Sequence, residues 1–140
     1  MSAGPGDIIL LDTDAFSAVF RDPADHPYHG VTEGRRLVIT LFTCAETLAG
    51  ATQANWGPAR VARLEEALAR LGVIQVTMRI VRTYAEVTAT AARIGHALAG
   101  PTQVTDRWIA ATAIRHQLPL LTGNTRHFDG FPGLNLVTTS

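Results

Sequence analysis

The sequence predicts an α/β domain of three layers, in which helices cover both faces of a central parallel sheet. Segments 8–12, 36–40 and 118–122 are short and mostly apolar, without the alternation expected of a strand that has one face in water. Stretches with a helical period separate them. A chain of 140 residues is long enough for one sizeable core, and we expect residues 1–140 to form a single domain.

The first half of the chain is expected to contain two strands, each followed directly by a helix, and then a third helix. Thr13 or Asp14 is the expected cap of the first helix. The third has one apolar stripe with helical spacing. The expected elements are strand 8–12, helix 13–21, loop 22–30, strand 36–40, helix 41–54 and a helix that starts at 57–58.

The second half is expected to continue the same alternation of strands and helices. Apolar residues recur at spacings of four and three between 80 and 98, which predicts a helix, and the sequence "GPTQVT" ends it. A helix opened by Asp106 then leads into the strand at 118–122. The other expected elements are strand 73–76 and a last strand at 134–138.

Composition narrows the class of protein. Apolar residues make up 46% of the chain and charged residues 17%, which is typical of a globular protein. The longest apolar runs fall well short of the roughly 20 residues of a membrane helix, so we expect no membrane association. The N-terminal segment lacks the basic residues of a secretory signal, and the single cysteine, Cys44, cannot form an internal disulfide. We therefore expect a cytoplasmic protein.

The basic residues are all arginine, and the formal net charge is zero. Without lysine, the chain cannot have a Walker-type phosphate loop or a Schiff-base lysine. Net charge alone does not indicate a nucleic-acid-binding protein. If a metal screened the acids at one site, however, the arginines would outnumber the remaining acids. The surface would then be weakly basic and would bind RNA with modest, salt-sensitive affinity.

Acidic residues occur where the predicted strands and helices meet. Asp12 ends the first strand, Glu46 lies in the second turn of the helix after strand 36–40, and Asp106 opens the helix before strand 118–122. Asn124 follows that strand. Because ligands of parallel sheets bind at the carboxyl ends of the strands, we expect these four residues to meet at one edge, with Asp14 and Asp129 nearby.

Such a group of acids favours a hard divalent cation. Carboxylates that lie close together repel one another and raise one another's pKa, and a bound cation compensates for this repulsion. Oxygen ligands without a histidine or cysteine spacing favour Mg²⁺, or else Mn²⁺. Such an ion can activate water for the hydrolysis of a phosphodiester. Structural roles remain open for single residues, since Asp106 alone could be a helix cap and Glu46 alone could be solvated.

Three motifs give the chain a family resemblance. "LLDTDAFS", "TCAETLAGA" and "DRWIAATAIRHQLPLLTGNTRHFDGFPGL" occur in family order and resemble the PIN domain, in particular the toxins of the VapC family from VapBC type II toxin–antitoxin systems. The resemblance implies a PIN-like α/β/α fold with a parallel sheet. It also implies a metal-dependent endoribonuclease that inhibits growth, acts as a homodimer on RNA, and is neutralised by a cognate antitoxin.

Carried across to this sequence, the resemblance assigns the three family acids to Asp12, Glu46 and Asp106. Asn124 stands at a fourth catalytic position that is often aspartate, and His127 at a position that is often acidic. An amide can offer a carbonyl oxygen but adds no charge. We therefore expect one firm Mg²⁺ held by the three acids, with either Asn124 or a nearby residue such as Asp14 as the fourth ligand.

Other residues near these motifs have alternative roles. Thr13, Ser17 and Thr122 are candidates to orient the ligands, or simply to cap helices. The tryptophans, Trp56 and Trp108, could stack on bases or pack in the core or at a dimer contact. Three basic residues next to the acids in sequence either contact RNA phosphates or are solvated; they are Arg107, Arg126 and His127.

Two further functions remain as alternatives. Asp12 and Asp14 form the DxD pattern of haloacid-dehalogenase-like phosphatases, in which the first Asp is the nucleophile and the second the general acid. Position 16 is Phe, where those enzymes usually have threonine or valine, and the downstream lysine is missing. The other alternative is a catalytically weak module that binds RNA or an antitoxin, its site degraded by the loss of the fourth acid.

Overall fold

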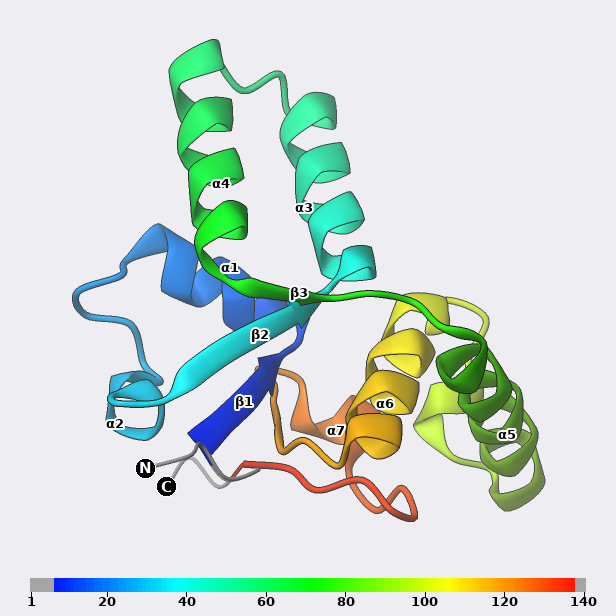
Figure 1. The fold of residues 1–140 in the computed structure, drawn as a ribbon. Coiled ribbons are helices and arrows are strands. Elements are labelled where there is room, and N and C mark those ends of the chain that lie inside the picture. Colours follow the sequence, from blue (N-terminus) through cyan, green and yellow to red (C-terminus); the bar gives the residue numbers. More distant parts are fainter. Residues whose placement is uncertain (1–6, 138–140) are drawn as a thin grey trace.

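A four-stranded parallel sheet forms the centre of the computed structural model, which describes residues 7–137 (Figure 1). The strands lie in the order β3-β2-β1-β4. Leu10 pairs with Val38 on one side and with Leu120 on the other, so β1 is a central strand. The strands are β1 (Ile8–Leu11), β2 (Arg36–Thr40), β3 (Gly72–Ile74) and β4 (Leu120–Leu121).

The helices cover both faces of this sheet, as the sequence predicts. Helices α3 and α4 form an antiparallel pair beside α1, while α5 and α6 pack against each other on the other side of the sheet (Figure 1). The helices are α1 (Thr13–Arg21), α2 (His29–Thr32), α3 (Leu41–Gln53), α4 (Pro58–Arg70), α5 (Met78–Ile94), η2 (Ala97–Ala99), α6 (Val104–His116) and α7 (Thr125–Phe128).

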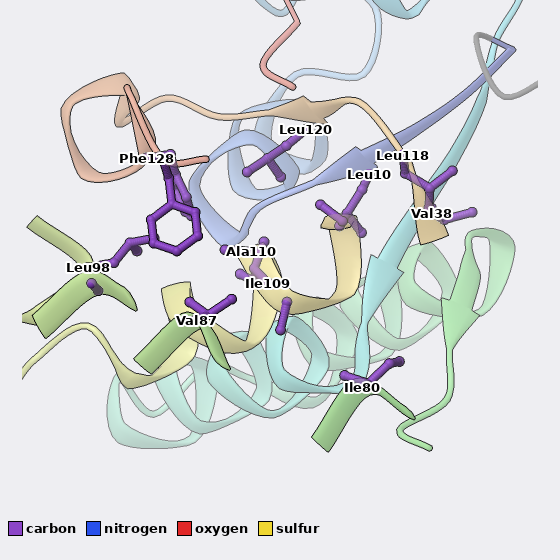
Figure 2. Close-up of a cluster of buried hydrophobic side chains, with 14 residues drawn as sticks. Leu10, Val38, Ile80, Val87, Leu98, Ile109, Ala110, Leu118, Leu120 and Phe128 are labelled. Atoms are coloured by element: carbon purple, nitrogen blue, oxygen red, sulfur yellow. The ribbon is translucent and has the colours of Figure 1, made fainter. Parts of the chain in front are cut away.

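Alternate residues of the buried strands supply two separate hydrophobic cores. Ile9 and Leu11 of β1 pack with Phe16 of α1 and with the buried leucines of α4. Leu10, on the opposite face, belongs to a second cluster, in which Ile109 and Ala110 of α6 lie between it and Val87 of α5 (Figure 2). Because side chains alternate across a strand, an apolar run without alternation is what a sheet with two covered faces requires. The three-layer α/β/α architecture is confirmed.

Two helices start directly at the carboxyl ends of strands, and this geometry brings the polar residues together. Asp12 follows β1 and is the N-cap of α1, while Thr40 ends β2 and is the N-cap of α3, its hydroxyl accepting a hydrogen bond from the Thr43 amide at 3.2 Å. The first turns of both helices therefore lie at the same edge of the sheet.

Several element boundaries differ from the expectation. Helix α5 stops at Ile94 because Gly95 takes a left-handed conformation, with φ +69°, and residues 97–99 form a separate 3-10 turn. Helix α6 begins at Val104, two residues before Asp106. The short helix α2 was not expected within 22–36. Strand β3 covers 72–74 rather than 73–76.

The expected last strand is reduced to one bridge between Leu120 and Leu136. The prediction covered 134–138, of which Thr138 lies outside the described residues. Strand β4 is also shorter than the predicted 118–122, although the Pro119 carbonyl accepts a hydrogen bond from the Leu10 amide at 3.0 Å. Among residues 7–137, no helix is long and apolar enough to cross a membrane.

Candidate active site

A cleft of about 360 Å³ lies where the ends of β1 and β4 meet the N-terminal ends of α1, α3 and α6. Four carboxylates line it, together with an amide and an imidazole from the segment after β4. All four residues predicted as catalytic are among them. The lining residues are Asp12, Thr13, Asp14, Glu46, Thr102, Gln103, Thr105, Asp106, Asn124 and His127.

Asp12 is the most deeply buried of the acids, with 2% of its surface exposed. One carboxylate oxygen accepts a hydrogen bond from the Ala15 amide at 2.8 Å and thereby caps α1, and the other accepts from the Thr122 hydroxyl. Burial raises the pKa of Asp12 from 3.8 to about 6; hydrogen bonds from Thr122 and Ala15 oppose this rise, and the charges of Asp14 and Asp106 add to it. Neither Thr13 nor Asp14, the expected caps, has this role.

Glu46 lies on the exposed side of the cleft and is held by α1. The Thr13 hydroxyl donates to a Glu46 carboxylate oxygen at 2.6 Å, and the same hydroxyl lies 3.1 Å from that of Thr43. Thr43 is fully buried in the first turn of α3. These contacts orient Glu46 toward the cleft, so it is not a freely solvated helix residue.

Asp106 belongs to the first turn of α6 but does not cap it. The N-cap is Gln103, which makes no side-chain capping bond, and the Asp106 carboxylate faces His127, with 3.0 Å between Oδ2 and Nδ1. Burial raises the pKa of Asp106, the contact with His127 opposes this, and the charges of Glu46 and Asp14 add to it. The capping role left open for Asp106 is therefore wrong.

Asp14 and Asn124 close the remaining side of the cleft. The Asn124 amide nitrogen donates to a carboxylate oxygen of Asp14, and the Asn124 backbone amide donates to Thr122 at 2.8 Å. Each of the four acids thus has a donor of its own from the protein. Tyr28 lies just behind this wall, since a Cβ built on Gly123 would be 3.0 Å from its hydroxyl oxygen.

The donor set of the cleft suits a hard cation, although it is not arranged around one ion. Oxygen atoms from four carboxylates point into one cleft whose lining contains no arginine, and divalent ions such as Mg²⁺ bind such ligands. Within residues 7–137, however, no three acidic, histidine or cysteine side chains are gathered closely enough to form a metal-binding group. The expected ligand set Asp12, Glu46 and Asp106 therefore stays a prediction.

The structure also assigns roles that the sequence did not indicate. Arg107 neither contacts the cleft nor is solvated: its guanidinium is buried and donates to the carbonyls of Leu98 and Gly100 at 2.7 and 2.9 Å. Tyr28 comes from a segment expected to be only a loop, and nothing in its local sequence indicated contact with the site. His127 is a direct partner of Asp106, so of its two expected alternatives the one in which it is merely solvated is wrong.

Comparisons with known proteins agree with this fold. A family model described as the PIN domain matches residues 9–133. DNA-bound VapBC from Salmonella typhimurium is similar in structure, with 25% identity, a TM-score of 0.78, and coverage of 94% of this chain and 98% of that chain. VapBC-1 from nontypeable Haemophilus influenzae has 23% identity, a TM-score of 0.77 and coverage of 94% and 98%. No curated protein sequence matches significantly.

Proposed function

Since the chain belongs to the PIN-domain family, we propose that it is a metal-dependent endoribonuclease and the toxin of a VapBC-type toxin–antitoxin pair. The observation that supports this most directly is the gathering of four carboxylates in one cleft, two of them with raised pKa values. Groups with perturbed pKa values in a cleft are typical of functional sites. The proposed catalytic residues are Asp12, Glu46, Asp106 and Asn124.

The chemistry of the proposed site depends on how the chain holds its acids. A bound Mg²⁺, or Mn²⁺, would supply an activated water and neutralise charge on the phosphodiester. Asp12, Glu46 and Asp106 would hold it through oxygen atoms. Thr122 and Thr13 orient the first two, and His127 orients the third. Asn124 holds Asp14, so we infer that Asp14 rather than Asn124 supplies a fourth oxygen.

The proposed partner is a cognate antitoxin. The similar solved structures include VapBC from Salmonella typhimurium and VapBC2 from Rickettsia felis, both with bound DNA. We propose that this chain likewise pairs with an antitoxin, acts in the cytoplasm and forms a homodimer. A neighbouring small open reading frame would be the expected genetic context.

The phosphatase alternative is less compatible with the site. In the DxD pattern the second aspartate must be available as a general acid, whereas here the Asp14 carboxylate accepts a hydrogen bond from Asn124. The residue at position 16 is Phe, and it is buried in the core against β1. A module that only binds RNA or an antitoxin would not cleave RNA, whereas the proposed enzyme would. The following experiment measures cleavage.

The test is incubation of the purified protein with total RNA, with mapping of the new ends. We expect cleavage with Mg²⁺ or Mn²⁺, none in excess chelator, and little action on double-stranded DNA. Glu46→Gln should abolish cleavage. Glu86→Gln, which changes the same residue type on the exposed surface of α5, should leave it unchanged. Undiminished cleavage in chelator would contradict the metal mechanism, and no cleavage under any condition would favour the binding module.

A further inference from the structure

Next to the acidic cleft, the surface between α1 and α4 carries a strongly basic groove. Its volume is about 510 Å³, and we call it the arginine groove. Four arginines line it, with a single acid that pairs with one of them: Glu66 lies 3.7 Å from Arg70. The residues that define the groove here are Phe20, Arg21, Arg60, Arg63, Glu66 and Arg70.

A smaller hollow joins the arginine groove to the acidic cleft. This hollow, of about 280 Å³, shares Thr13 and Glu46 with the acidic cleft. It shares Phe20, Arg21 and Arg60 with the arginine groove. The three hollows therefore form one continuous track that starts at the proposed catalytic carboxylates and runs along α1. From Thr13 to Arg21 this helix extends about 12 Å, at about 1.5 Å per residue.

From this track we propose that the arginine groove binds the single-stranded RNA substrate on one side of the cleavage site, an inference that rests on the proposed function. Without a bound cation the acidic cleft repels phosphates, and His127 is the only basic side chain in its lining. Affinity for a polyanion must therefore come from outside the cleft. Arginines bind phosphate through paired N–H donors. The arginine groove is joined to the cleft by the smaller hollow, which shares residues with both.

Aromatic side chains along the track favour a nucleic acid over a simple anion. The rings of Phe20 and Trp56 are stacked at 6.2 Å, and the Arg60 guanidinium lies over the Trp56 ring at 3.6 Å. Both aromatic residues are only partly buried. A guanidinium held over an aromatic ring is a platform on which unpaired bases stack. Basic residues interleaved with aromatic rings are the pattern expected for single-stranded RNA.

The second basic cluster of the chain provides a matched control. Arg79 and Arg82 lie at the start of α5, where they line a separate hollow that shares no residue with the acidic cleft. Arg60 and Arg63 lie at the start of α4 with the same spacing of three residues. All four arginines are exposed. The double variants Arg60→Gln/Arg63→Gln and Arg79→Gln/Arg82→Gln therefore remove the same charge from similar helical positions.

The test measures binding of a labelled oligouridylate to the full-length chain in chelator, by filter retention over a series of salt concentrations. Thermal melts establish that both double variants are folded. We expect the Arg60/Arg63 variant to bind about tenfold more weakly, with a salt slope lower by about 1.4, because two phosphate contacts to a single strand are lost. The Arg79/Arg82 variant should bind like the parent protein.

Three results would overturn the inference. The first is an unchanged affinity of the folded Arg60/Arg63 variant, and the second is an equal loss in both variants, which would indicate a diffuse charge effect. The third is an Arg60/Arg63 variant that no longer binds a glutamate-rich peptide but binds RNA as the parent protein does, which would assign the groove to a protein partner. Binding in chelator does not depend on cleavage. A protein that binds RNA through the groove but never cleaves it would refute the proposed function alone.

Discussion

At the scale of single residues, Asp12 combines two tasks in one carboxylate. One oxygen caps α1 through the Ala15 amide, and the side chain lines the acidic cleft. Because burial raises its pKa to about 6, the ionised form costs folding free energy. An ionised aspartate at this position therefore lowers the stability of the fold. Such a cost is typical of a residue that serves a functional site rather than the fold.

The first prediction concerns the pH dependence of this cost. Between pH 3.8 and about 6 the folded chain holds a proton on Asp12 that the unfolded chain has released, so stability should fall as pH rises through this window. A shift of about two pKa units corresponds to about 3 kcal/mol. Asp12→Asn should flatten this slope and unfold at higher denaturant near neutral pH. Denaturant titrations in chelator across the window measure it, and an unchanged slope would contradict it.

The second prediction separates catalysis from stability at Asp106. Asp106→Asn keeps the shape but removes a charge from the acidic cleft, so cleavage of RNA and any growth inhibition should be lost. In chelator the variant should melt no lower than wild type, because the raised pKa of Asp106 shows that its charge is unfavourable there. Magnesium should raise the wild-type melting temperature more than that of the variant. An active variant would refute the site assignment.

The third prediction uses the contact between Asn124 and Asp14. Asn124→Asp replaces an N–H donor with a second carboxylate, so the variant should melt a few degrees lower in chelator because like charges now face each other. The added charge should tighten binding of Mg²⁺. Calorimetric titration with Mg²⁺ measures this, with Asp129→Asn as a control at an exposed acid of the same segment. Unchanged or weaker Mg²⁺ binding would show that position 124 does not face an ion.

The acids of the site could be predicted because they follow from topology. The residue after a parallel strand and the first turns of the next helix meet at one edge, whatever their separation in sequence. Donors such as Thr122, 110 residues from Asp12, could only be suggested. The position of Tyr28 behind the site and the burial of the Arg107 side chain could not be predicted. Both depend on how loops pack, and loop packing leaves no periodic pattern in the sequence.

At the scale of elements, helices α5 and α6 end in the same left-handed conformation but with different residues. Gly95 ends α5 with φ +69°, and Gln117 ends α6 with φ +54°. A left-handed residue with a Cβ costs about 1 kcal/mol or more, whereas glycine pays no such penalty. The end of α6 is therefore less stable with Gln117 than it would be with a glycine at the same position.

The fourth prediction follows from this difference. Gln117→Gly should stabilise the chain by about 0.5 kcal/mol, since the greater freedom of glycine in the unfolded chain offsets part of the gain. Gly95→Ala should destabilise it by about 1 kcal/mol. No atom lies within 4 Å of the Cβ that it adds, so the effect is conformational. Denaturant unfolding of both variants measures this, and equal shifts in one direction would contradict it.

Element types were predictable because apolar spacing reflects packing, whereas boundaries depend on local contacts. Helix α5 was expected to run to 98 because Leu98 continues the apolar spacing. The left-handed Gly95 breaks the helix, and Leu98 is still buried in the same core from a 3-10 turn. Asp106 was expected to open α6 because aspartate is a good cap. Its carboxylate instead faces His127, and the helix starts without a side-chain cap.

At the scale of the whole molecule, the charges are separated although they sum to zero. The acidic cleft holds four of the 12 acids, and the arginine groove holds four of the 12 arginines. The net charge sums over the whole chain, so its value of zero gave no information about the acidic cleft or the arginine groove. The joined track could not be predicted because it depends on how α1 and α4 pack side by side.

The fifth prediction is a homodimer. Several large apolar side chains remain on the surface of the described residues, including Met78 at 60% and Ile94 at 48% exposure. Covering such residues is a common reason for self-association. Light scattering at micromolar concentration should give twice the chain mass of 15.0 kDa. A monomer mass under these conditions would contradict the prediction.

The packing of the two tryptophans gives the molecule two separate optical reporters. Trp108 lies between Tyr84 and Phe42, with ring centroids 3.9 and 4.8 Å away, and so reports on the packing of α3, α5 and α6. Trp56 lies beneath Arg60 beside the arginine groove. A base that stacks there would quench the fluorescence of Trp56 and leave that of Trp108 unchanged. Titration of a Trp108→Phe variant would therefore follow occupancy of the groove without any label.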